Sequence, residues 1–297
     1  MNYKSLLGTA VAAALMFGAQ AASACSISAW QQPATGLTAA DTGDATFSRY
    51  SGRCSLKVIN SNGGAGRFVT DTTPNDEASY RVRFYYFTGN ISGVTDIFQA
   101  RNTGGTNIIR VTHDGNLLSF TTNNGGAAQT VPVLDGRYYS IELAWAAGAG
   151  NGSMTGSVRG ASSAGQTVFP APAPGNLAGS VNFPTLGNNA DRITEARLGM
   201  IEGNPTVTAP VYFDEFDSRR TQNPGRLCRG DAGGGAGGVP DGLIGSADRI
   251  LITNEILNNA LTKPQGQADA NEDGIIASAD RIAVTNMILN SGTCANN

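Results

Sequence analysis

The chain has 297 residues, with 23 acidic and 20 basic side chains, one histidine and a formal net charge of −3. This balance excludes the strongly basic face typical of nucleic-acid-binding proteins, so we expect no nucleic-acid partner. Beyond the first residues, no apolar run approaches the ~20 residues that a membrane-spanning helix needs, and we predict no transmembrane segment.

The first 24 residues have the features of a secretory signal peptide. A start containing Lys4 precedes an apolar run to Phe17, and small residues at 22–24 form a cleavage site. We expect the mature protein to begin at Cys25 and to be secreted, either extracellular or associated with the cell surface, with the periplasm as a further location. The alternative is a lipoprotein acylated at Cys25, although Ala22 is not the large aliphatic residue that such signals prefer.

Residues 25–220 are predicted to form one all-β domain, because short apolar runs alternate with turn-forming residues and helical periodicity is absent. The predicted strands are 54–60, 79–87, 95–101, 107–112, 117–122, 138–145, 153–159, 192–201 and 210–218. Turn sequences at 114–116, 123–126 and 135–136 separate several of them. We interpret the Pro- and Ala-rich stretch 160–176 as a surface loop, since later strands are needed to close the sheets.

Two of these strands have a clear period of two. In 138–145 the odd-numbered residues, all apolar, share one face, and in 80–85 the side chains of Arg81 and Arg83 point away from the apolar set. This alternation predicts half-buried strands of a sandwich.

Several segments resemble the concanavalin-A-like, or laminin-G-like, jelly-roll domains of secreted bacterial proteins. They are 68–71 with Pro74 and Glu77, 80–84, 197–199 and 211–220. The resemblance spans most of residues 40–220. It implies a mainly β protein built on a concanavalin-A-like jelly-roll sandwich, and it indicates fold rather than function.

The candidates for glycosidase chemistry are three carboxylates, Asp214, Glu215 and Asp217. Jelly-roll glycosidases carry acidic pairs on a strand, and regular alternation would put Glu215 and Asp217 on one face. The position where the glucanase motif needs a further glutamate is Arg219, so an acid would have to come from Glu142 or Glu195. We therefore assign no catalytic residue and expect a solvated charged face.

His113 and the aromatic residues offer two further site hypotheses. No GxSxG motif accompanies His113, which lies near a predicted hairpin end, so we expect a turn histidine rather than a triad member. A glycan-binding surface would need exposed aromatic side chains. The candidates are Trp30, Tyr85, Tyr86 and Tyr138. Packing is the favoured role for each, and the phase of Trp145 places it in the core.

After a predicted linker, 221–226, the chain contains an internal repeat. The segment 241–259, DGLIGSADRILITNEILNN, recurs 32 residues later as 273–291, DGIIASADRIAVTNMILNS. Each copy is an acidic loop followed by a helix. The second loop begins at Asp269 and has oxygen-bearing side chains at loop positions 1, 3, 5 and 12. Its predicted calcium ligands are Asp269, Asn271, Asp273, Asp280 and the carbonyl of Ile275.

The first copy departs from this spacing. Asp241, the carbonyl of Leu243 and Asp248 keep their places, but Gly237 and Val239 would occupy positions 1 and 3. If Asp231 is aligned with Asp269 instead, the first ligand is recovered and a glycine-rich insertion, 233–240, lies inside the loop. Flexible insertions cost little closure entropy. We expect two calcium ions, with weaker binding at the first loop.

Asp at position 12 and the Pro-containing connector 263–266 make residues 227–295 resemble the dockerin family. The resemblance implies a small α-helical module that binds two calcium ions and docks onto a cohesin domain of another protein. It also implies that loop positions 10 and 11 contact the partner. Those positions hold Ser246, Ala247, Ser278 and Ala279, and the helices carry Asn254 and Asn286 where many family members have basic residues.

The four cysteines are even in number, which suits an oxidising compartment and two disulfides. We expect Cys25 to pair with Cys54, and Cys228 with Cys294. The second bridge would tie together the two ends of the repeat module, which is too small to build a large core.

These features predict a secreted, non-catalytic protein. Its jelly-roll domain would recognise a polysaccharide or a surface component, and its dockerin-like module would attach to a cohesin-like or other surface protein. One alternative is an extracellular structural or adhesion protein without sugar specificity. A second is a polysaccharide-degrading enzyme, a glycoside hydrolase or lyase, whose acidic residues come together only in the fold.

Overall fold

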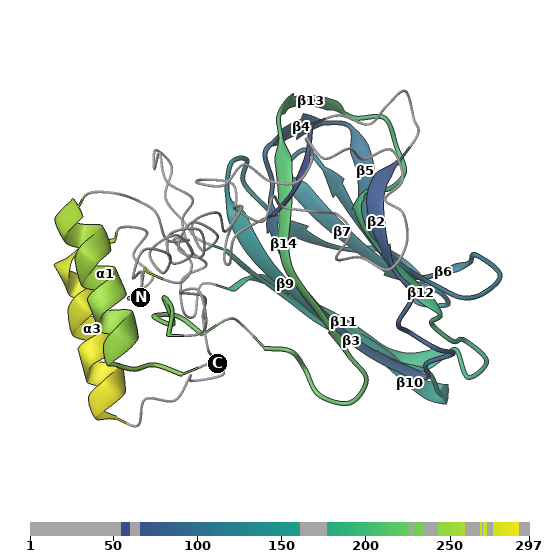
Figure 1. Ribbon diagram of the computed structural model, residues 1–297. Helices are drawn as coiled ribbons and strands as arrows, with labels where there is room; N and C mark the ends of the chain where they lie inside the picture. The colour runs from purple at the N-terminus through teal and green to yellow at the C-terminus, as the bar shows by residue number, and fades with distance from the viewer. Residues whose placement is uncertain are drawn as a thin grey trace, which may run out of the picture.

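The computed structural model describes residues 55–59, 66–160, 177–225, 228–234, 243–258, 268, 270–271 and 276–290. Figure 1 shows strands in the larger part of the chain and two helices near the C-terminus. The predicted signal peptide, Cys25, Trp30, Cys54 and Cys294 lie outside these ranges.

Two six-stranded antiparallel sheets form the β domain. The first has the order β1 (Leu56–Val58), β14 (Val211–Arg219), β3 (Ser79–Phe87), β9 (Tyr138–Ala146), β10 (Ala149–Gly160), β11 (Leu177–Gly187). The second has the order β2 (Arg67–Asp71), β12 (Glu195–Met200), β5 (Val94–Arg101), β6 (Asn107–Asp114), β7 (Leu117–Thr122), β8 (Gln129–Pro132). A short pair, β13 (Thr206–Ala209) and β4 (Asn90–Ser92), completes the described strands.

The two sheets enclose one hydrophobic core, and the predicted alternation explains how. Tyr139, Ile141, Leu143 and Trp145 of β9 are all buried in this core, as are the even-numbered residues of β3. From the second sheet, β5, β6, β7 and β12 contribute residues to the same cluster. Each fully buried apolar side chain contributes about 1.5–3 kcal/mol. The predicted mainly β sandwich is therefore confirmed.

The outer face of the first sheet carries a second aromatic cluster. Tyr85, Tyr138 and Tyr212 are buried there, and Phe87 packs against them. These residues alternate with the core positions of β3, β9 and β14, so the first sheet has buried aromatic side chains on both of its faces.

The strand predictions agree with the structure where alternation is regular. Strands β3 and β7 have the predicted bounds, and β6 extends two residues further, to Asp114. The list of predicted strands lacked β2, β4, β8, β11 and β13. In β12, Gly199 adopts a φ of 141°, and a Cβ there would collide with the carbonyl oxygen of Arg67 on the neighbouring β2. The glycine of the 197–199 motif is thus required by close strand packing.

The C-terminal helices are α1 (Ser246–Asn258) and α3 (Ser278–Leu289). Their first residues are 32 positions apart, as the repeat predicts. Buried residues from the loops and from both helices form a small core: Ala232, Ile244, Ile252, Ala268, Ala270 and Val284. Cys228 packs against this core and is disulfide-bonded, and its predicted partner Cys294 is outside the described part of the chain. Neither helix has the length and apolar character that a membrane span requires.

Candidate functional site

The two repeats fold in the same way around one aspartate each. Asp248 is the third residue of α1, and its Oδ2 accepts a hydrogen bond from the backbone N–H of Gly245 at 2.7 Å. Asp280 has the same place in α3, and its Oδ2 accepts from the N–H of Ala277 at 2.7 Å. A carboxylate at this position satisfies an N–H at the start of the helix and interacts favourably with the helix dipole.

The second oxygen of each aspartate reaches back to the start of its loop. Oδ1 of Asp248 accepts from the N–H of Gly233 at 2.9 Å, across 15 residues, and Oδ1 of Asp280 accepts from the N–H of Asn271 at 3.1 Å, across 9 residues. Gly233 and Asn271 are therefore equivalent, and the first loop is longer by 15 − 9 = 6 residues. Two residues before Gly233 and Asn271, the sequence has Asp231 and Asp269, respectively. This equivalence corresponds to the alignment in which the first loop contains an insertion.

The two loops pack against each other at their starts. Ala232, Ala268 and Ala270 are fully buried, and a Cβ added to Gly230 would lie 2.9 Å from a methyl group of Val284 and 3.3 Å from the Cβ of Ala270. Small side chains are needed here because no space is left between the loops.

The described calcium-ligand candidates are largely buried. Asp231, Asp248 and Asp280 are 3%, 2% and 0% exposed, respectively, while Asn271 is half-buried. Asp241, Asp269, Asp273 and Ile275 fall outside the described ranges, and within those ranges no group of three or more acidic, histidine or cysteine side chains comes together. Leu243, proposed to bind through its carbonyl, has an exposed side chain. Buried carboxylates in a short loop are the donor chemistry that a hard divalent cation prefers.

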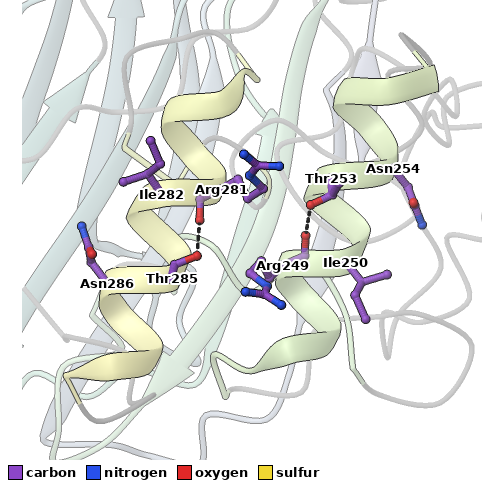
Figure 2. Close-up of a pocket in the computed structure, with 8 residues that line it drawn as sticks. All are labelled: Arg249, Ile250, Thr253, Asn254, Arg281, Ile282, Thr285 and Asn286. Carbon is purple, nitrogen blue, oxygen red and sulfur yellow. Dashed lines mark hydrogen bonds between the residues drawn. The ribbon is translucent and has the colours of Figure 1, made fainter.

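A groove lies between the two helices, which are in contact with each other. It has a volume of about 580 Å³ and is lined by four repeat-related pairs: Arg249 and Arg281, Ile250 and Ile282, Thr253 and Thr285, Asn254 and Asn286. Figure 2 shows the helices running in opposite directions, with the arginines and threonines on the sides that face each other. The isoleucines and asparagines lie on the outer sides.

Of the residues in this groove, the sequence had singled out only Asn254 and Asn286. The predicted partner-binding residues Ser246, Ala247, Ser278 and Ala279 are all exposed in the first turn of each helix, but they do not line the groove. The available signal was the repeat itself. The residues that line the groove are identical in the two copies, and none of them belongs to the small core. Identity at such surface positions indicates a surface that both repeats share.

The acidic group on β14 is interrupted by a β-bulge. Asp214 pairs with Tyr85 and Asp217 with Arg83, so three steps on β14 match two on β3. Glu215 lies within the bulge with a φ of 50°. The alternation that would put Glu215 and Asp217 on one face of a regular strand does not hold across this bulge.

The carboxylates of this sheet have structural partners. Oδ1 of Asp214 accepts from the N–H of Glu215 at 2.8 Å, and Asp217 pairs with Arg219 at 2.8 Å. Glu142 accepts from the N–H of Gly225 at 2.6 Å and from the side-chain amide of Asn223 at 3.1 Å. On the other sheet, Glu195 pairs with Arg197 at 2.9 Å. Each of these contacts joins a carboxylate to an N–H, an amide or a guanidinium of the fold.

The three described aromatic candidates for glycan binding are buried. Tyr85, Tyr86 and Tyr138 have no exposed surface, and Trp145 is in the core as expected. His113 is also fully buried, on the inner face of β6. Its Nδ1 contacts the hydroxyl of Tyr86 at 2.8 Å, and its Nε2 contacts the carbonyl of Gly115 at 2.6 Å.

Fold and site together define a β-sandwich protein with a C-terminal pair of loop–helix repeats. A comparison with protein-family models and with curated proteins gives no match. Among solved structures, the chain is similar to a sialidase (TM-score 0.37, 12% identity, 57% of this chain and 15% of that chain). It is also similar to "Cellulose induced protein, Cip1" (TM-score 0.41, 18% identity, 65% and 94%) and to the receptor binding domain of a botulinum neurotoxin mosaic serotype C/D (TM-score 0.39, 9% identity, 62% and 41%). The chain thus spans only a small part of the sialidase. Similarities at this level assign neither a family nor a ligand.

Proposed function

We propose that this chain is a secreted, non-catalytic binding protein with two modules. The β-sandwich, as a jelly-roll domain, recognises a glycan or a surface component. The dockerin-like C-terminal module, stabilised by calcium, attaches the protein to a partner protein of the cohesin type or another surface protein. The observation that carries the attachment is the groove between α1 and α3, where both repeats present the same four residue types.

The exposure of the groove residues supports a binding surface. Ile250 and Ile282 are 56% and 58% exposed, and Leu257 and Leu289, near the helix ends, are more exposed still. Single exposed apolar residues are ordinary, but here equivalent residues are exposed on both helices beside the groove, where a partner can cover them. Arginine and large apolar side chains are typical of the centre of protein interfaces.

The calcium part of the proposal is supported by the buried carboxylates. In the first loop Asp231, Asp241, Asp248 and the Leu243 carbonyl would hold one ion. In the second, the ligands would be Asp269, Asn271, Asp273, Asp280 and the Ile275 carbonyl. Burying carboxylates is costly unless their charge is offset. A bound calcium ion would supply that charge and link each loop to the start of its helix.

Calorimetric titration of the secreted chain with calcium tests the two loops separately. We expect two binding events of unequal affinity. Asp269→Ala should remove the tighter event and Asp231→Ala the weaker one, since each removes the first ligand of its loop. Asp217→Ala, which removes a surface carboxylate of the sandwich paired with Arg219, is the control and should leave both events unchanged. A chain that takes up no calcium would contradict this part of the proposal.

The role of the sandwich is tested with the same chain on a panel of insoluble polysaccharides. Retention without release of reducing sugar is the expected result. If the chain is retained on none of them, the structural or adhesion alternative replaces the glycan-binding one. Release of sugar that is lost on Glu215→Gln would instead identify a glycoside hydrolase.

A further inference from the structure

The groove between α1 and α3 contains two arginines whose charges have no described counterpart. Arg249 and Arg281 are exposed, and Figure 2 shows their side chains on the facing sides of the two helices. Within the described ranges, neither guanidinium forms a hydrogen bond or an ion pair. A guanidinium has only N–H donors and no acceptor, so a group that satisfies it must offer oxygen acceptors.

The threonine hydroxyls of the groove are already hydrogen-bonded within their own helices. The hydroxyl of Thr253 donates to the carbonyl of Arg249 at 2.6 Å, and that of Thr285 to the carbonyl of Arg281 at 2.7 Å. Both hydroxyl protons are therefore used within their own helices. The donors left for a partner are the two guanidiniums, with the amides of Asn254 and Asn286 further out.

Charge is distributed unevenly over this module. Residues 227–297 contain 8 acidic and 4 basic side chains, a balance of 4 − 8 = −4. Seven of the acids belong to the two loops or the first turns that follow them, and the eighth, Glu255, is only 7% exposed and does not line the groove. Two of the four basic residues are Arg249 and Arg281. The groove is thus a positive strip on a negative module.

We infer that this groove binds an acidic protein surface, in which carboxylates engage Arg249 and Arg281 and apolar side chains cover Ile250 and Ile282. The inference rests on the proposed attachment function and names the chemistry of the partner. Carboxylates match the planar fork of arginine through paired hydrogen bonds. A highly charged polyanion such as a nucleic acid is disfavoured, because Arg249 and Arg281 are the only cations among the described residues that line the groove.

The probe is a pair of synthetic 12-residue peptides with blocked ends, one made of alternating Leu and Glu and the other of alternating Leu and Gln. Their binding to the calcium-saturated full chain is measured by fluorescence anisotropy. We expect the Glu peptide to bind and the Gln peptide to bind at least about tenfold more weakly, which is about 1.4 kcal/mol. Binding of the Glu peptide should weaken as salt increases, because exposed charges are screened.

Variants of the full chain locate the binding site of the Glu peptide. Arg249→Glu and Arg281→Glu should each weaken its binding about tenfold. The two factors should be similar, because the two sites are repeat-related. The double variant should bind about a hundredfold more weakly if the two free-energy changes are additive. Arg249→Lys with Arg281→Lys keeps the charge but not the planar fork, and should bind with an affinity between that of the original chain and that of the Glu variants. Arg159→Glu makes the same charge change on β10 of the sandwich and should have little effect.

Equal binding of the two peptides, or a Glu peptide whose binding is unaffected by Arg249→Glu with Arg281→Glu, would overturn the inference. Circular dichroism of each variant with calcium establishes that the helices are intact. A chain that binds neither peptide, yet captures a purified partner in a calcium-dependent way that resists both substitutions, would retain the attachment function and lose only the acidic chemistry assigned to the groove.

Discussion

His113 occupies an inner position of β6, and its two ring nitrogens have different partners. The carbonyl of Gly115 can only accept, so Nε2 carries the proton of the neutral ring and donates to it at 2.6 Å. Nδ1 is then the acceptor for the Tyr86 hydroxyl at 2.8 Å. This arrangement fixes the neutral tautomer, and no solvent reaches the ring. Its role is to satisfy the buried hydroxyl of Tyr86 and to hold the carbonyl of Gly115 in the turn after β6.

Burial lowers the pKa of His113 from 6.5 to about 4. The unfolded chain therefore binds this proton at a higher pH than the folded one. The contribution of His113 to the free energy of unfolding is fully present above pH 6.5. It falls as the pH is lowered towards 4 and does not change further below that pH. The loss attributable to His113 is about 3 kcal/mol. Urea denaturation at pH 7, 5.5 and 4 measures it.

His113→Gln tests this assignment, since an amide can keep both hydrogen bonds but does not titrate. We expect the variant to lose less stability than the original chain between pH 7 and pH 4. Tyr86→Phe is the matched control: it removes the hydrogen bond but leaves the histidine buried, which is the main cause of the pKa shift. An identical pH dependence in His113→Gln and the original chain would show that other groups cause the acid sensitivity.

At the scale of elements, the segment after β14 is held against the first sheet by a cross-strand pair, Arg83 and Glu142. Arg83 donates to the carbonyl of Glu215 at 3.2 Å and to that of Gly225 at 3.3 Å. Glu142 accepts from the N–H of Gly225 at 2.6 Å. The segment 221–225, predicted as the start of a linker, is therefore fixed to the sheet where the chain leaves it.

Glu142→Gln should loosen this attachment. A hydrogen bond to a charged group contributes about 1.5–3 kcal/mol, so we expect trypsin to cleave after Arg220 or Arg226 roughly tenfold faster, because cleavage follows local opening. Glu195→Gln removes an acid that is ion-paired on the other sheet and is the control. Equal cleavage rates in the two variants would mean that Glu142 does not hold the segment.

How far the sequence predicted these elements depended on their place in the sheets. Central strands such as β3 and β9 alternate regularly because one face meets the core, and they were predicted well. Strand β11 was missed because Gly179 and Pro184 interrupt its pattern, which an edge strand tolerates. The bulge in β14 and the groove between α1 and α3 were beyond prediction, since each depends on how two distant segments meet. The repeat did predict a helix after each loop, at a spacing of 32 residues.

For the whole molecule, the two hydrophobic cores share no residue. The sandwich core contains residues from β1 to β14, and the small core contains only residues from 228 onwards. Among the described residues, the small core has six buried apolar residues, three of them alanines, and so contributes little free energy of burial. We therefore expect the C-terminal module to depend on calcium and on the disulfide of Cys228, whereas the sandwich does not.

Differential scanning calorimetry of the full chain tests this division. We expect two transitions, of which only the smaller moves to lower temperature with a chelator, because a ligand stabilises the unit that binds it by an amount set by its concentration and affinity. Reduction of the disulfide should lower the same transition, since the closed loop no longer restricts the unfolded module. The larger transition serves as the internal control in the chelator experiment only, because reduction would also open the predicted bridge between Cys25 and Cys54. A single transition that shifts as a whole would mean that the sandwich and the repeat module unfold together, and that calcium binding at the loops contributes to the stability of the entire protein.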